Sequence, residues 1–186
     1  MADRRCIIGI GNRYRRDDGL GPLAIDALRA LNPTEEADQG VTLIEHSGEA
    51  LSLINAWASF DSVVIVDAAR GPLPGRPIIL DPGTQDIPRD SFRGGSHVLG
   101  LAEAIHLARE LDCLPPRLRI EAVVGEDFSA GEGLSPPVQR ELAALITRVR
   151  AFFVAIGSLR LLLQPFQGVC CSCRCTASPA NNILLK

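Results

Sequence analysis

Residues 6–21 read CIIGIGNRYRRDDGLG, and this stretch decides the fold. It opens with a short apolar run, which is typical of a central parallel strand that helices cover on both faces. Leucine and alanine side chains then recur at helical spacing from Leu20 to Leu31, and Pro22 is tolerated because it falls in the first turn. A buried strand that passes through a polar loop into an amphipathic helix predicts the first half of a strand–helix–strand unit.

The same two patterns alternate along the rest of the chain. Apolar runs predict strands and helical spacing predicts helices; the strands are 6–10, 41–46, 63–67, 77–81 and 118–124, and the helices are 19–31, 49–57, 97–111 and 137–150. Strands that alternate with helices imply right-handed crossovers between parallel strands. The sequence therefore predicts an α/β fold, a three-layer sandwich in which a twisted, mostly parallel sheet of about five strands is flanked by helices on both faces.

The length and composition predict one domain. A chain of 186 residues, 46% of them hydrophobic, is long enough for one buried core and too short for two domains. We expect the domain to cover residues 1–157 and to be followed by an atypical Cys-containing tail, residues 158–186, that is poorly ordered. A soft-metal site and an altered reading frame are the alternative explanations of this tail. Its cysteines are too crowded for the CxxC pairs of a zinc site; they are Cys170, Cys171, Cys173 and Cys175.

Charge and hydropathy argue against nucleic acid and against a membrane as partners. The net charge is −3 and the signs are mixed, so no basic stripe is present that would neutralise a phosphate backbone. The apolar tract 152–166 carries Gly157, Arg160 and Pro165 and is shorter than the ~20 residues that span a bilayer. The N-terminal apolar run breaks at Asn12, too early for a signal peptide. We expect a cytoplasmic monomer with reduced cysteines.

Acidic and histidine side chains follow the predicted strands. Asp17 and Asp18 lie in the loop after the first strand, His46 ends the second, Asp67 ends the strand 63–67, and His97 opens a later helix. In such sheets, ligands bind outside the carboxyl ends of the strands. We therefore expect two carboxylates and an imidazole to converge at this edge.

A nucleotide site is one alternative for the glycine loop. Gly9 and Gly11 supply the start of a dinucleotide-binding fingerprint, and Glu45 is placed where an acid would bind a ribose. The third fingerprint position is Tyr14 rather than glycine, and two aspartates follow where the pyrophosphate would sit. Taken alone, the glycines are best explained by a tight turn without a ligand.

Each candidate site residue has a structural alternative. Asp17 is interpreted as a helix cap or loop support, and Asp18 as the ligand that points outward, although spacing alone does not choose between them. Asp67 could instead pair with Arg70, and His97 by itself could be an ordinary helix-start histidine. The convergence of the acids is what favours a site, because two carboxylates ~4 Å apart repel by roughly 4 kcal/mol at an effective dielectric of about 20.

A cation would relieve this repulsion. Two aspartates and a histidine suit zinc, nickel or manganese, and three protein ligands leave positions open for a substrate. Other nucleophiles compete poorly. Cys6 lies within a predicted strand, and Cys113 has no catalytic base that is visible in the sequence. Ser96 lies beside His97, but adjacency alone does not make a catalytic triad, so a cysteine or serine hydrolase is a weak interpretation.

Four blocks in this order carry a family resemblance: GIGNRYRRDDGLG (9–21), VVIVDAARGPLPG (63–75), SHVLGLAEAIHLAREL (96–111) and VVGEDFSAGEGLSPPV (123–138). With them, residues 5 to about 150 resemble the hydrogenase maturation endopeptidases. The resemblance implies a twisted α/β sheet flanked by helices. It also implies an enzyme that removes the C-terminal extension of a nickel–iron hydrogenase large-subunit precursor after nickel insertion.

The resemblance assigns roles by position. The metal-contacting and catalytic residues of the family fall on Asp18, Asp67 and His97, and the nickel is implied to arrive with the precursor rather than to reside in the protease. The supporting loop contributes Gly11, Asn12 and Asp17.

One block departs from the family, since HSGEALSLINAW (46–57) stands where many members carry a glycine-rich DGG-like loop. Glu49 in this block is interpreted as a helix-start acid, and a rim contact is the alternative. A nickel-binding accessory protein without hydrolytic activity is the second functional hypothesis, and a nucleotide-binding module is the third.

Overall fold

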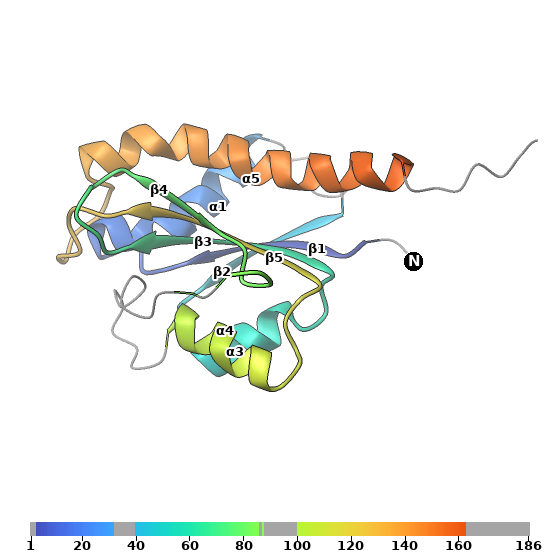
Figure 1. The fold of residues 1–186 in the computed structure, drawn as a ribbon. Coiled ribbons are helices and arrows are strands. Elements are labelled where there is room, and N and C mark those ends of the chain that lie inside the picture. The colour runs from blue at the N-terminus through green and yellow to red at the C-terminus, as the bar shows by residue number, and fades with distance from the viewer. Residues whose placement is uncertain (1–2, 32–39, 86, 88–99, 163–186) are drawn as a thin grey trace, which may run out of the picture.

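The computed structural model describes residues 3–31, 40–85, 87 and 100–162, of which 156–162 are described by their backbone alone (Figure 1). The elements in chain order are β1 (Arg5–Ile10), a short 3-10 helix η1 (Arg16–Gly19), α1 (Leu20–Leu31), β2 (Val41–His46), α3 (Ala50–Trp57), β3 (Ser62–Ala69), β4 (Pro77–Leu80), α4 (Leu101–Glu110), β5 (Arg117–Val124) and α5 (Pro136–Leu162).

The strands form one mixed sheet in the order β2-β1-β3-β5-β4. β2, β1, β3 and β5 pair in parallel, whereas the edge strand β4 pairs antiparallel with β5. Helices α1 and α5 cover one face, and α3 and α4 cover the other (Figure 1). The predicted three-layer α/β sandwich with a mostly parallel sheet is thereby confirmed.

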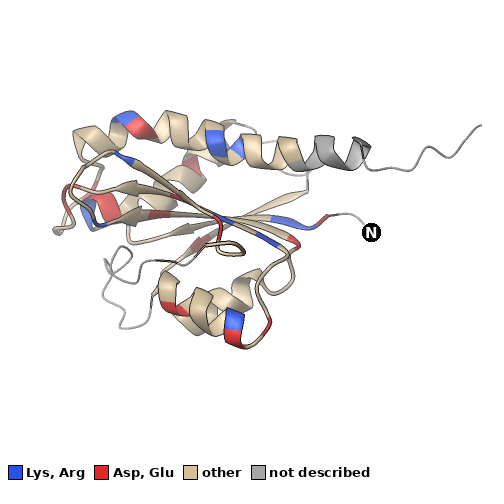
Figure 2. Cartoon of the chain, in the orientation of Figure 1, with Lys and Arg blue, Asp and Glu red and all other residues tan. Residues whose placement is uncertain are grey.

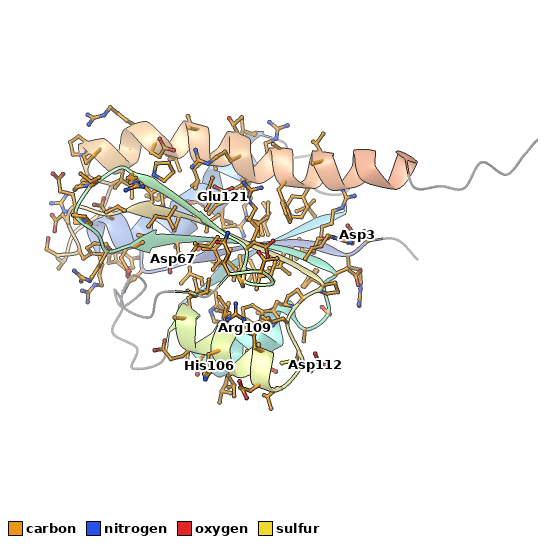
Figure 3. The ribbon with its side chains drawn as sticks, viewed as in Figure 1. Asp3, Asp67, His106, Arg109, Asp112 and Glu121 are labelled. Atoms are coloured by element: carbon orange, nitrogen blue, oxygen red, sulfur yellow. The ribbon has the colours of Figure 1, made fainter. Side chains whose placement is uncertain are left out.

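Strand β3 shows why the central runs are continuously apolar. All of its residues are buried. Val63 and Ile65 pack in the core beneath α3 and α4, while Val64 and Val66 pack in the core beneath α1 and α5. Because successive side chains of a strand point to opposite faces, Asp67 lies on the α3/α4 face of the sheet, as Figure 3 shows.

Three predicted boundaries differ from the structure by more than one residue. Strand β3 continues two residues beyond Asp67, because Ala68 and Ala69 still pair with β5. The helix predicted at 97–111 begins at Leu101, and its positions 97–99 lie outside the described residues. The helix predicted at 137–150 extends to Leu162, because the apolar run after position 150 continues it across the expected domain boundary.

Helix α5 is long but carries charges of both signs (Figure 2). Within the described ranges, no helix combines the length and the apolar character needed to cross a bilayer. The remainder of the predicted tail, from position 163, lies outside the described residues.

A buried ion-pair network joins α5 to the sheet. Glu121 of β5 is fully buried between the sheet and α5 (Figure 3). Arg148 Nε donates to Glu121 Oε2 at 2.9 Å, and Arg119 Nη2 lies 2.8 Å from the other carboxylate oxygen. Arg148 Nη1 also donates to Glu141 Oε1 at 2.7 Å. The network places opposite charges on a carboxylate that would otherwise be costly to bury.

Removing one arginine from this network should destabilise the fold. We expect Arg148→Met to cost about 3 kcal/mol, because a buried carboxylate then keeps only the ion pair with Arg119. Glu141→Gln, at the partly exposed end of the network, should cost less than about 1 kcal/mol. Urea unfolding of both variants measures the difference, and an Arg148→Met midpoint equal to that of the unaltered protein would contradict it.

Candidate active site

The loop after β1 folds back on itself at Gly11. The Gly11 N–H donates to the His46 carbonyl at 3.0 Å, and its φ of +134° is one that side chains rarely allow. A Cβ at this position would lie 1.7 Å from the Asp18 carbonyl oxygen. The Asn12 N–H donates at 3.1 Å to both the carbonyl and the Oδ2 of Asp18. The glycine turn therefore fixes where the Asp18 carboxylate lies.

The features that suggested a nucleotide site have structural roles instead. A Cβ on Gly9 would lie 2.3 Å from the Gly21 carbonyl oxygen, so this glycine permits β1 and α1 to approach closely. Glu45 pairs with Arg13 at 2.8 Å and with Arg29 at 2.7 Å. These ion pairs hold the pKa of Glu45 below its usual range, because the Arg13 hydrogen bond favours the charged carboxylate.

Asp17 joins the first loop to the loop between β5 and α5. Its carboxylate is fully buried and accepts hydrogen bonds from the N–H groups of Glu126, Asp127 and Ser135 at 2.7, 2.9 and 2.7 Å. The Ser135 hydroxyl donates to it as well, at 2.8 Å. Asp17 thus supports the loop that carries the adjacent Asp18.

Asp67 and Asp18 form the chemically unusual pair. Each has only 6% of its surface exposed. Burial raises the pKa of Asp67 well above its usual range and the nearby charge of Asp18 raises it further, although the Ala68 N–H, which donates to Asp67 Oδ1 at 2.7 Å, opposes the shift. The pair therefore holds two carboxyl groups in a poorly solvated place where the carboxyl group of Asp67 is difficult to ionise.

The Asp67–Arg70 ion pair considered as an alternative does not form. Both residues are described, and the ion pairs of the described residues do not include one between them. The Arg70 guanidinium instead lies 4.5 Å from the ring centroid of Phe128, a cation–π contact. Asp67 therefore keeps its raised pKa without a compensating arginine.

The arginines of the loop contact the protein itself. Arg13 forms a hydrogen-bonded ion pair with Asp26 and a second ion pair with Glu45, Arg15 Nη2 donates to the Phe128 carbonyl at 3.1 Å, and Arg16 Nη1 donates to the Glu132 carbonyl at 3.1 Å. These contacts brace the loop that carries Asp17 and Asp18.

The segment that departs from the family forms a rigid turn into α3. Glu49 accepts hydrogen bonds from the N–H groups of Leu51 and Ser52 at 3.1 and 2.8 Å, which confirms it as a helix-start acid. The Gly48 N–H donates to His46 Nδ1 at 2.9 Å, so the proton of a neutral ring is on Nε2, which lies 2.9 Å from the Ser52 hydroxyl. His46 is thus engaged at the rim of the sheet edge.

The predicted third site residue, His97, lies outside the described residues, as does Ser96. Among the residues that are described, no three His, Cys, Asp or Glu side chains gather in the manner of a metal site. Cys6 is fully buried, which confirms its packing role, and burial raises the pKa of its thiol to about 12. A thiol with this pKa is a poor nucleophile.

Sequence reasoning overlooked the structural role of the loop 125–135. Its backbone supplies most of the donors to Asp17, and Gly131 exchanges hydrogen bonds with Tyr14 and Arg16. The available signal was position, because this polar, glycine-containing segment directly follows β5 at the same sheet edge as the acids.

Comparison with known proteins gives a consistent result. A family model described as hydrogenase maturation protease matches residues 25–151, a span that contains Asp67 and begins after Asp18. The hydrogenase expression/formation protein HupD from Rhizobium leguminosarum bv. viciae is 27% identical over 159 residues, which cover 80% of this chain and 74% of HupD.

Solved structures share the fold. The hydrogenase maturating endopeptidase HybD from E. coli has a TM-score of 0.63 at 23% identity, covering 83% of this chain and 94% of HybD. The [NiFe] hydrogenase maturation protease HycI from Thermococcus kodakarensis KOD1 has a TM-score of 0.59 at 24% identity, covering 81% of this chain and 92% of HycI. Together with the family match, the fold places this chain among the endopeptidases. It belongs to the hydrogenase maturation protease family, as the four sequence blocks predicted.

Proposed function

We propose that the protein removes the C-terminal extension of a [NiFe]-hydrogenase large-subunit precursor after nickel has been inserted, and that it recognises the precursor through the nickel ion. The observation that supports this proposal most strongly is the pair of nearly buried carboxyl groups, Asp18 and Asp67, at the carboxyl edge of the sheet in a maturation-protease fold.

The electrostatics of the pair favour a cation as the group that is recognised. Two acids in a poorly solvated place raise the cost of ionisation, as the pKa of Asp67 indicates. A divalent ion brought by the precursor neutralises both charges, and carboxylate oxygens together with an imidazole are ligands that nickel accepts. In this proposal Asp18 and Asp67 bind the ion, and His97 is the third ligand by its position in the SHVLG motif.

The rigid loops determine how such binding promotes cleavage. Asp18 is positioned by the Asn12 N–H and by the Asp17 network, so little reorganisation accompanies binding. When the two aspartates bind the precursor's nickel, the adjacent peptide bond is held in one place beside the metal. The ion can then polarise the carbonyl group or a water molecule. A precursor without nickel lacks the group that aligns it, which makes cleavage dependent on metal insertion.

Mass spectrometry of the intact precursor tests this function. A nickel-loaded large-subunit precursor from the same organism is incubated with the protein, beside a nickel-free precursor as control. We expect a C-terminal peptide to be lost from the loaded precursor only. Equal cleavage of both would refute recognition through nickel, and cleavage of neither would favour the non-hydrolytic nickel-binding protein.

A further inference from the structure

A pocket lies at the carboxyl edge of the sheet, with its wall residue Ile78 two strands away from Asp67. It has a volume of about 370 Å³ and is formed by the segment that connects β3 to β4, together with the end of β5. Leu73, Ile78 and Val124 contribute apolar walls, and Arg70 and Arg76 contribute cationic groups. A concave apolar site with a few polar groups is the usual form of a ligand subsite.

The strand register places part of the wall of this pocket, Ile78 and Val124, on the same face of the sheet as the Asp67 carboxyl group, whereas Ile79 points to the opposite face. Asp67 of β3 pairs with Ala122 of β5, and Ala122 pairs with Ile78 of β4. Directly paired residues point to the same face, so Ile78 lies two strand spacings, about 10 Å, from Asp67. Val124 follows Ala122 by two residues and therefore points to that face as well. About three extended peptide residues span such a distance.

The backbone of the pocket is fixed by the sheet. The Gly75 N–H donates to the Val124 carbonyl at 2.7 Å, the Val124 N–H donates to the Arg76 carbonyl at 2.9 Å, and the Arg76 N–H donates to the Leu73 carbonyl at 3.1 Å. These bonds extend the pairing of β4 with β5 and close a tight turn. The pocket is therefore formed before any ligand arrives, which limits the entropy lost on binding.

The charge of the pocket is complementary to a carboxylate. Arg76 is exposed, and no ion pair joins it to an acid in the part of the chain that the structure describes. Arg70 lies over the Phe128 ring and adds a second positive charge to the lining. This pair of arginines contrasts with the two acids at the neighbouring site.

We propose that this pocket binds part of the precursor's C-terminal extension, with an apolar side chain against Leu73 and a carboxylate on Arg76. The inference rests on the proposed function, because the extension is the part of the substrate that continues away from the bond aligned at Asp67. Arg76 determines specificity for the extension and takes no part in the chemistry. The carboxylate belongs either to an acidic side chain or to the C-terminus of the extension.

The first test compares Arg76→Gln with Arg150→Gln in the full-length protein, acting on the nickel-loaded precursor. We expect Arg76→Gln to raise KM about fivefold without changing kcat, because an exposed ion pair binds the substrate and the transition state equally. Arg76→Lys should recover most of the lost affinity. Arg150 is an exposed arginine of α5 on the opposite face, and its variant should keep the original KM.

An unchanged KM for Arg76→Gln, or an equal rise in KM for Arg150→Gln, would overturn the proposal that this pocket binds the extension, and the proposed function would still stand. A lower kcat at the original KM would also overturn it, because it would place Arg76 in the chemical step. Complete absence of cleavage by the unaltered protein, in contrast, would refute the proposed function itself.

A second measurement needs no cleavage and identifies the carboxylate. A synthetic peptide with the sequence of the extension is titrated into the unaltered protein and into Arg76→Gln. One peptide carries amides in place of its acidic side chains, and another carries a C-terminal amide. We expect one of the two to bind the unaltered protein about fivefold more weakly and to be insensitive to Arg76→Gln. Equal binding of all the peptides would overturn the proposal.

Discussion

Replacing Asp67 with asparagine is expected to abolish processing of the precursor while leaving the fold at least as stable at neutral pH. In the proposed mechanism this change removes a ligand of the precursor's nickel, and with it several kcal/mol of alignment and charge stabilisation. About 4 kcal/mol corresponds to a roughly thousandfold lower rate. The amide oxygen of asparagine can still accept the hydrogen bond from the Ala68 N–H, so the backbone loses little. Initial cleavage rates of the nickel-loaded precursor measure the effect.

The stability part of this prediction follows from the raised pKa of Asp67. Between its unfolded value, near 3.8, and its higher folded value, the folded state holds more protons on Asp67 than the unfolded state does. This contribution to stability therefore falls as the pH rises through that window. Asparagine does not ionise, so the variant lacks this loss, and its stability relative to that of the unaltered protein should increase as the pH rises above about 4.

Asp112→Asn is the matched control, because Asp112 is exposed after the end of α4, far from Asp67 (Figure 3). Urea unfolding at several pH values, together with cleavage assays, separates the two effects. Full activity of Asp67→Asn would remove Asp67 from the site. An inactive variant that is also much less stable than the unaltered protein would show that Asp67 has mainly a structural role.

The second large effect is expected at Asp17. Asp17→Ala should lower the free energy of unfolding by about 3–5 kcal/mol, because it leaves the N–H groups of Glu126, Asp127 and Ser135 without their buried acceptor. Processing should fall as well, since the loop that positions Asp18 loses its support. Unfolding by urea and precursor cleavage at a temperature where the variant is folded give the two readouts.

Two further variants test whether smaller changes near Asp17 have smaller effects on stability. Ser135→Ala removes one hydroxyl donor and should cost only about 1 kcal/mol. Asp127→Ala changes a partly exposed neighbouring acid, whose carboxylate accepts a hydrogen bond from the Ser129 N–H at 2.8 Å, and should cost no more than about 1 kcal/mol. If Asp17→Ala matched Asp127→Ala in stability, the network would contribute little to the fold.

The layers and the parallel core could be predicted because a strand that is buried on both faces has a continuously apolar sequence. Strand β3 is apolar at every position from Val63 to Val66, which only a covered central strand requires. The antiparallel direction of β4 could not be predicted, because a four-residue run, PIIL, has no feature that depends on strand direction. The end of α5 was missed because an apolar run shows no helical periodicity of its own.

Some parts of the candidate site could be predicted from the sequence, and others could not. Topology alone brings Asp18 and Asp67 to one sheet edge, so their proximity followed from the strand order. The partners of Arg13 could not be found, because Asp26 and Glu45 lie on other elements and nothing in the local sequence links them. The pocket near Arg76 depends equally on the antiparallel pairing of β4, which only the structure shows.

The most direct test of the central claim is a comparison of how tightly the protein binds loaded and empty precursors. A precursor made uncleavable by proline after the bond identified by mass spectrometry is titrated, with and without nickel, into the unaltered protein and into Asp18→Asn. We predict at least tenfold tighter binding of the nickel-loaded form by the unaltered protein, and loss of most of that preference in Asp18→Asn. Equal affinity for the two precursors, or a preference that Asp18→Asn retains, would contradict recognition of the precursor's nickel by these carboxylates.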